Sequence, residues 1–140
     1  MIVVIDTNVF VSGVIRPFSK PAGILRLAAS GALRMAYDLR LISEYREMLS
    51  RPRFGVASDA LDGLFLQIQE EGTPVVASPL GFRLPEPDDE AFLEVALSAG
   101  AQALITGIKR HFPKKAYGEV RILNPAEFLE IWPGPGSVQL

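Results

Sequence analysis

Residues 2–11 read Ile2-Val3-Val4-Ile5-Asp6-Thr7-Asn8-Val9-Phe10-Val11, and they give the strongest indication of the fold class. The first four residues are β-branched and show no alternation of apolar and polar positions, which is typical of a parallel strand covered on both faces. The next three are good helix N-cap residues, and the apolar residues after them begin a helix that extends to about residue 15. The chain therefore opens with a buried strand that leads directly into a helix.

The same alternation of strand and helix patterns continues to about residue 131. Further strands are predicted at 33–37, 75–77, 103–106 and 120–123, and further helices at 22–30, 38–50, 58–71, 88–99 and 125–131. This order predicts an α/β fold, a three-layer α/β/α sandwich with a central parallel sheet of about five strands. Because no linker divides the 140 residues, we expect one domain over 1–132 and a flexible tail over 133–140.

Composition narrows the classes of function. The absence of cysteine excludes disulfides and thiolate chemistry and favours a cytoplasmic location. No apolar stretch approaches the ~20 residues that cross a bilayer, so no membrane association is expected. The 49% hydrophobic fraction suits a sheet buried on both faces or a self-association surface. A net charge of −2 gives no overall basic field, so a polyanion would need a local basic patch or a metal.

Three carboxylates far apart in the sequence lie at the boundaries of predicted elements. Asp6 follows the first strand, and Glu44 lies in the first turns of the helix at 38–50. Asp89 opens the helix that leads to the strand at 103–106. Because ligands of parallel sheets bind beyond the carboxyl ends of the strands, we expect these acids to converge at one edge of the sheet.

Such a cluster predicts a site for a hard divalent cation, Mg²⁺ or Mn²⁺, because the chain offers carboxylates, no cysteine and one histidine. A cation of this kind orients and deprotonates a water molecule and neutralises charge that builds on a phosphoryl oxygen. The reaction that fits is hydrolysis of a phosphate ester or a phosphodiester.

Each acid also has a purely structural explanation. Asp6 is a preferred helix N-cap residue. Glu44 could be a solvated residue that pairs with Arg40 or Arg46 of its own helix. The acidic pair at 88–89 suits a helix start, through capping and through the helix dipole. These explanations treat each acid alone and give no reason for all of them to fall at one sheet edge.

The run from Lys109 to Lys115 is the only dense basic cluster in the sequence. Lys109 and Arg110 are its candidate contacts to substrate phosphate, since they follow the strand end that carries Thr106. The alternative is an ordinary solvated loop. His111, the only histidine, could act as a general acid, but a lone histidine beside Phe112 is more often structural or solvated.

Four blocks of sequence are decisive when taken together, and they occur in this order: Ile5-Asp6-Thr7-Asn8-Val9-Phe10; Ile42-Ser43-Glu44-Tyr45-Arg46-Glu47-Met48-Leu49; Pro87-Asp88-Asp89-Glu90-Ala91-Phe92-Leu93-Glu94-Val95-Ala96; and Leu104-Ile105-Thr106-Gly107. Over residues 2 to about 131 the chain resembles a PIN domain. It is most similar to the prokaryotic PIN proteins grouped as toxins of toxin–antitoxin systems, the VapC type.

The resemblance implies an endoribonuclease that depends on Mg²⁺ or Mn²⁺ and whose catalytic, metal-binding acids match Asp6, Glu44 and Asp89. It implies supporting roles for Thr7, Asn8, Asp88 and Thr106. Asp89 is preferred to its neighbour as the ligand because it has the family's spacing to the small residue Ala96. The resemblance also implies RNA as the substrate, a cognate antitoxin protein as a partner, and a homodimer.

One position departs from the family pattern. The polar residue expected after the Thr-Gly pair is Ile108, and an aliphatic side chain cannot ligate a metal. This departure keeps open a degenerate PIN module that binds RNA or a protein with little catalysis. A phosphohydrolase of small phosphate esters is a second alternative, although the second acid that an aspartyl-phosphate enzyme needs is replaced by Asn8.

Overall fold

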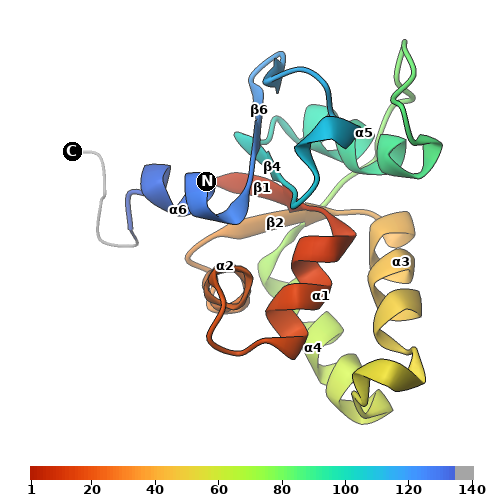
Figure 1. Ribbon diagram of the computed structural model, residues 1–140, viewed down its shortest axis with the longest axis vertical. Helices are drawn as coiled ribbons and strands as arrows, with labels where there is room; N and C mark the ends of the chain where they lie inside the picture. Colours follow the sequence, from red (N-terminus) through yellow and green to blue (C-terminus); the bar gives the residue numbers. More distant parts are fainter. Residues whose placement is uncertain (135–140) are drawn as a thin grey trace.

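The computed structural model describes residues 1–134 and confirms the α/β class, with a mostly parallel central sheet between layers of helices (Figure 1). The strands are β1 (Ile2–Ile5), β2 (Arg34–Tyr37), β3 (Thr73–Pro74), β4 (Ala103–Ile105), β5 (Ala116–Tyr117) and β6 (Val120–Leu123). Among the described residues they form one six-stranded sheet in the order β3-β2-β1-β4-β6-β5. The flexible tail expected over 133–140 lies, apart from its first two residues, outside the described part of the chain.

Helices cover both faces of the sheet. The α-helices are α1 (Thr7–Ile15), α2 (Lys20–Ala29), α3 (Leu39–Leu49), α4 (Ser58–Glu71), α5 (Glu90–Ala99) and α6 (Pro125–Ile131), and the short 3₁₀ helices are η1 (Pro52–Phe54), η2 (Pro87–Asp89) and η3 (Lys109–His111). Figure 1 shows α5 on one side of the sheet and α1, α2 and α4 on the other. Within residues 1–134, no helix is both long enough and apolar enough to span a bilayer.

The strand order places a topological switch beside the first strand. From β1 the sheet is extended on one side by β2 and β3, and on the other by β4 and β6, all of them parallel to their neighbours. In open parallel sheets the crevice at such a switch, beyond the carboxyl ends of the strands, is the usual ligand site. The fold therefore directs the residues that follow β1 and β4, including Asp6, towards one such crevice.

Two details of the sheet differ from the prediction. The strand predicted at 75–77 pairs instead at Thr73–Pro74 and adds only one more bond, from the Val75 N–H to the Tyr37 carbonyl (2.9 Å). The chain leaves the sheet there because β2 itself ends at Tyr37 and offers no further partner. The second difference is β5, which is antiparallel to β6 and is reached through a tight turn with Gly118 at φ 59°.

A stack of buried aromatic rings connects the helices beneath the site. Phe10 of α1 stacks on Tyr45 of α3, with ring centroids 4.2 Å apart, and on Phe65 of α4 at 5.7 Å. The Tyr45 hydroxyl donates a hydrogen bond to the carbonyl of Ile5, the last residue of β1. Helix α3 is thereby fixed to the strand end from which Asp6 follows.

Candidate functional site

Asp6 is a buried carboxylate at the junction between β1 and α1. It is the N-cap of α1, with extended backbone angles, and its side chain is only 4% exposed. Oδ1 accepts a hydrogen bond from the Thr7 backbone N–H (2.8 Å), and Oδ2 accepts one from the Thr106 hydroxyl (2.7 Å) and a longer one from Asn8 Nδ2 (3.4 Å). The predicted N-cap role is therefore confirmed, and the same carboxylate is oriented by residues from two strand ends.

The residues after β4 hold Asp6 in place through a short chain of hydrogen bonds. The backbone N–H of Ile108 donates to the Thr106 hydroxyl (3.1 Å), which donates in turn to Asp6. The backbone N–H of Gly107 donates to Asn8 Oδ1 (3.1 Å), and a Cβ on this glycine would lie 3.2 Å from the same oxygen. The support that Ile108 gives to Asp6 uses its backbone, so it does not require a polar side chain at that position.

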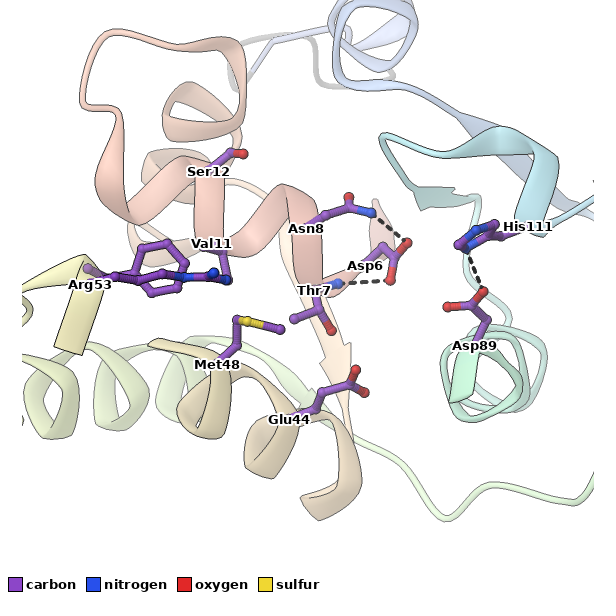
Figure 2. A pocket seen from close by; sticks show the side chains of 11 residues that line it. Asp6, Thr7, Asn8, Val11, Ser12, Glu44, Met48, Arg53, Asp89 and His111 are labelled. Atoms are coloured by element: carbon purple, nitrogen blue, oxygen red, sulfur yellow. Dashed lines mark hydrogen bonds and ion pairs between the residues drawn. The ribbon is translucent and has the colours of Figure 1, made fainter. Parts of the chain in front are cut away.

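The three predicted acids line one cavity of about 370 Å³. Asp6 lies at the end of β1, Glu44 projects from α3, and Asp89 lies at the junction of η2 with α5 (Figure 2). The residues that line this cavity are Asp6, Thr7, Asn8, Val11, Ser12, Glu44, Met48, Arg53, Phe54, Asp89 and His111. The convergence expected from the sequence is therefore present.

Neither arginine expected as a partner of Glu44 pairs with it. Arg40 forms ion pairs with Asp38 and Glu94, and Arg46 forms one with Asp62. The solvated-pair explanation of Glu44 is therefore wrong. Its carboxylate instead faces the cavity (Figure 2).

Asp89 is met by the only histidine of the chain. Nδ1 of His111, from η3, lies 2.9 Å from Asp89 Oδ2, and both side chains face the cavity (Figure 2). The geometry of this contact is not that of a regular hydrogen bond, so Oδ2 remains a buried acceptor without one. The Asp89 side chain also makes no capping hydrogen bond to α5, although it occupies the N-cap position. Helix capping therefore does not explain this carboxylate.

Burial raises the pKa values of all three acids, and repulsion from neighbouring acids adds to the rise for Glu44 and Asp89. Burial is the largest cause for Asp6, opposed mainly by the Thr106 and Thr7 hydrogen bonds. For Glu44 burial is again the largest cause; the nearby Thr7 hydroxyl lowers the pKa without forming a regular hydrogen bond, and neighbouring acids raise it. The pKa of Asp89 is raised to about 6 by burial and by Asp6, against the opposing effect of His111. Clustered acids of this kind favour binding of a cation.

Comparison with known families decides the identity of the fold. A family model described as the PIN domain matches residues 2–109, more than half of the chain. The chain belongs to the PIN domain family. PIN domains are generally nucleases, and they generally use divalent metal ions. No curated protein matches the chain significantly.

The donors of this PIN domain suit a hard divalent cation. Asp6, Glu44 and Asp89 present carboxylate oxygens to a shared cavity, and the buried Asp89 Oδ2 has no regular hydrogen bond. Within residues 1–134, however, no three acidic or histidine side chains are close enough together in this conformation to surround one ion. The chemistry of the residues fits the cation, and a bound ion would have to draw the carboxylates together.

Other predicted site residues of the PIN domain lie around the cavity rather than in it. Thr106 is fully buried and reaches the cavity only through Asp6, and Asp88 is exposed in η2. Lys109 forms an ion pair with Glu127 (Nζ–Oε1 2.9 Å). Glu127 also belongs to the capping box at the N-terminus of α6. Arg110 is exposed and, like Lys109, does not line the cavity. Their contact with substrate phosphate stays a prediction.

Sequence reasoning missed five side chains that line the cavity: Val11, Ser12, Met48, Arg53 and Phe54. Met48 lies one helical turn after Glu44 on α3, a spacing that could have identified it. Arg53 and Phe54 come from η1, and no feature of the sequence around Arg51-Pro52 distinguishes them from an ordinary helix end. Their place in the cavity depends on the packing of α3 beside α1, which is visible only in three dimensions.

The raised pKa values predict that the metal-free protein loses stability as the pH rises from 5 to 7. The folded state holds protons that the unfolded state releases near pH 4, so this stabilisation is complete below that pH and is lost as the pH passes the folded value of about 6 for Asp89. After discounting for solvent around this side chain, we expect a decrease of roughly 1–2 kcal/mol. Urea unfolding in EDTA at pH 5, 6 and 7 measures it.

Asp89→Asn is the matched variant for this measurement, because Asp89 is the acid of the cavity whose pKa is raised most. Its unfolding free energy should change less between pH 5 and 7 than that of the parent. A parent protein that becomes more stable over this range would contradict the raised pKa values.

Proposed function

We propose that this PIN domain is a metal-dependent endoribonuclease that hydrolyses phosphodiester bonds of RNA in the cytoplasm, with Mg²⁺ or Mn²⁺ as cofactor. The observation that carries the proposal is the meeting of Asp6, Glu44 and Asp89 in one cavity at the switch point of the sheet. Their raised pKa values support it, because a cluster of buried carboxylates gains most from a cation.

The residues in and around the cavity have different proposed roles. Asp6 and Asp89 would be the direct ligands of the cation, and Glu44 would reach in from α3. When bound, the cation supplies a water of lowered pKa and neutralises charge on the phosphoryl oxygens. Thr106 and Asn8 keep Asp6 in one orientation, which is the usual contribution of residues that hydrogen-bond a metal ligand.

The experiment that tests this function is incubation of the purified protein with a labelled single-stranded RNA in Mg²⁺, in Mn²⁺ and in EDTA. We expect cleavage products with an internal cut in either cation and none in EDTA. A small ester such as p-nitrophenyl phosphate, assayed in parallel, should be a much poorer substrate. Cleavage that persists in EDTA, or preference for the small ester, would refute the proposal.

We further propose that the nuclease is the toxin of a toxin–antitoxin pair, bound by a cognate antitoxin and active as a homodimer. The support is the similarity of the four sequence blocks to VapC-type proteins. In addition, a cell that makes an active ribonuclease needs an inhibitor that covers its catalytic acids, and an antitoxin would be that inhibitor. An antitoxin should then co-purify from co-expressing cells and suppress the cleavage described above.

A degenerate PIN module that binds RNA with little catalysis is the second candidate. It is favoured by Ile108 and by the separation of the acids in this conformation. Binding of RNA by the parent protein without cleavage in Mg²⁺ or Mn²⁺ would identify it.

A further inference from the structure

The cavity that holds the acids is not acidic throughout. In Figure 2 Asp89 lies at one end of the labelled side chains and Arg53 at the other, with Thr7 and Met48 between them. Arg53 is the only lysine or arginine among the residues that line the cavity. A single cavity therefore offers both carboxylates and a guanidinium, which enter it from different elements.

The guanidinium of Arg53 is available for a ligand. It forms no ion pair within residues 1–134, whereas the neighbouring Arg51 is paired with Glu47 (3.3 Å). Its carbon Cζ lies 4.8 Å from the centroid of the Phe54 ring, and Phe54 is itself partly buried against the core. The Phe54 ring holds the guanidinium of Arg53 against its flat face and leaves the guanidinium N–H groups free. This combination is suited to binding phosphate.

Arg53 and the acids approach the cavity from different elements, with Arg53 beyond the end of α3 (Figure 2). Glu44 and Met48 both line the cavity and are one turn, ~6 Å, apart along α3, and Arg53 follows after the end of that helix. The wall of the cavity also includes the apolar side chains of Val11 and Met48. Such a wall can contact the base or the ribose of a bound nucleotide.

Resting on the proposed ribonuclease function, we propose that Arg53 and Phe54 form a subsite of the same cavity that binds a backbone phosphate of single-stranded RNA. Arg53 contacts that phosphate, and Phe54 is a positioning residue that holds the guanidinium. This assigns to η1 a role in substrate binding alongside the basic run that follows β4.

The test measures RNA binding separately from cleavage. Binding of a fluorescent twelve-nucleotide single-stranded RNA is followed by anisotropy in Mg²⁺ over a range of salt, in an Asp6→Asn background that prevents turnover. We expect Arg53→Gln to weaken binding about tenfold at low salt and to reduce the slope of log Kd against log[salt] by ~0.7, the value for one phosphate contact on a single strand. Arg53→Lys should retain the slope, and Phe54→Leu should weaken binding less.

Matched controls lie outside the cavity. Arg51→Gln removes a cation two residues away that is already paired, and Phe18→Leu removes a fully exposed aromatic ring, so neither should alter the salt slope. Thermal unfolding of each variant verifies that the domain is folded.

The two proposals fail in different ways. An Arg53→Gln slope equal to that of the parent, or no RNA binding by the parent at all, overturns the subsite whatever the cleavage assay shows. Absence of cleavage by the wild-type chain while binding still depends on Arg53 overturns the nuclease function and leaves the subsite standing.

Discussion

Replacing Asp6 by asparagine should reduce metal-dependent RNA cleavage by at least ~100-fold, because even residues that only orient a metal ligand contribute 10–100-fold. The change removes the charge of a carboxylate that is 4% exposed and that three side-chain and backbone donors hold in one orientation. Initial rates on labelled RNA in Mn²⁺ measure the effect. In cells, expression of the wild-type chain alone should arrest growth, and the variant should relieve that arrest.

The fold should survive this substitution. Burial raises the pKa of Asp6, so at pH 7 the folded protein without metal carries an unfavourable buried charge that asparagine lacks. The unfolding temperature of the variant in EDTA should therefore equal or exceed that of the parent. Asp62→Asn is the matched control, because this aspartate is exposed on α4 and paired with Arg46. Equal rates of RNA cleavage by the Asp6→Asn variant and the parent would show that cleavage does not depend on the proposed metal site.

Truncating Tyr45 to alanine should cost 3–5 kcal/mol of unfolding free energy, the range for a large aromatic residue in a core. Tyr45 is fully buried, its ring lies 4.2 Å from that of Phe10 in a nearly parallel stack, and its hydroxyl donates to the Ile5 carbonyl. A loss of this size is a large part of the 5–15 kcal/mol that stabilises a typical domain. Urea denaturation followed by circular dichroism measures it.

Two further variants separate the ring of Tyr45 from its hydroxyl. Tyr45→Phe keeps the stack and leaves the Ile5 carbonyl without this donor, which should cost about 1–2 kcal/mol. Leu66→Ala, at an exposed position of α4, should change stability by less than ~0.5 kcal/mol. A Tyr45→Ala variant within ~1 kcal/mol of the wild type would mean that the aromatic stack does not join α1 to α3.

The sequence predicted those parts of the fold that local patterns determine. The β-branched run before Asp6, the N-cap at that residue and the helix at 125–131 were each predicted and are present, because strand patterns and helix-start signals act over a few residues. The short pairing at Thr73–Pro74 and the antiparallel β5 were not predicted. Their length is set by where a neighbouring strand ends, which no local pattern encodes.

The sequence predicted the part of the candidate site that depends on the topology of the sheet. The convergence of Asp6, Glu44 and Asp89 follows from the rule for parallel strand ends, and the resemblance to PIN domains implies the same three acids. The contact of His111 with Asp89 and the entry of Arg53 into the cavity could not be predicted. Both depend on how short 3₁₀ segments pack against distant helices, and no periodic pattern of residues in the sequence indicates such packing.

The hydrogen bond from Thr106 to Asp6 also bears on synthesis of the chain. The two residues are 100 positions apart, and the bond from Gly107 to Asn8 spans 99. The strand before Asp6 is central in the sheet but gains its β4 neighbour only after more than two thirds of the chain has been made. Contacts this distant form late, so a nascent chain on the ribosome carries the acids unassembled until β4 has emerged and docked. Translation itself thus delays the moment at which the candidate site of this protein exists.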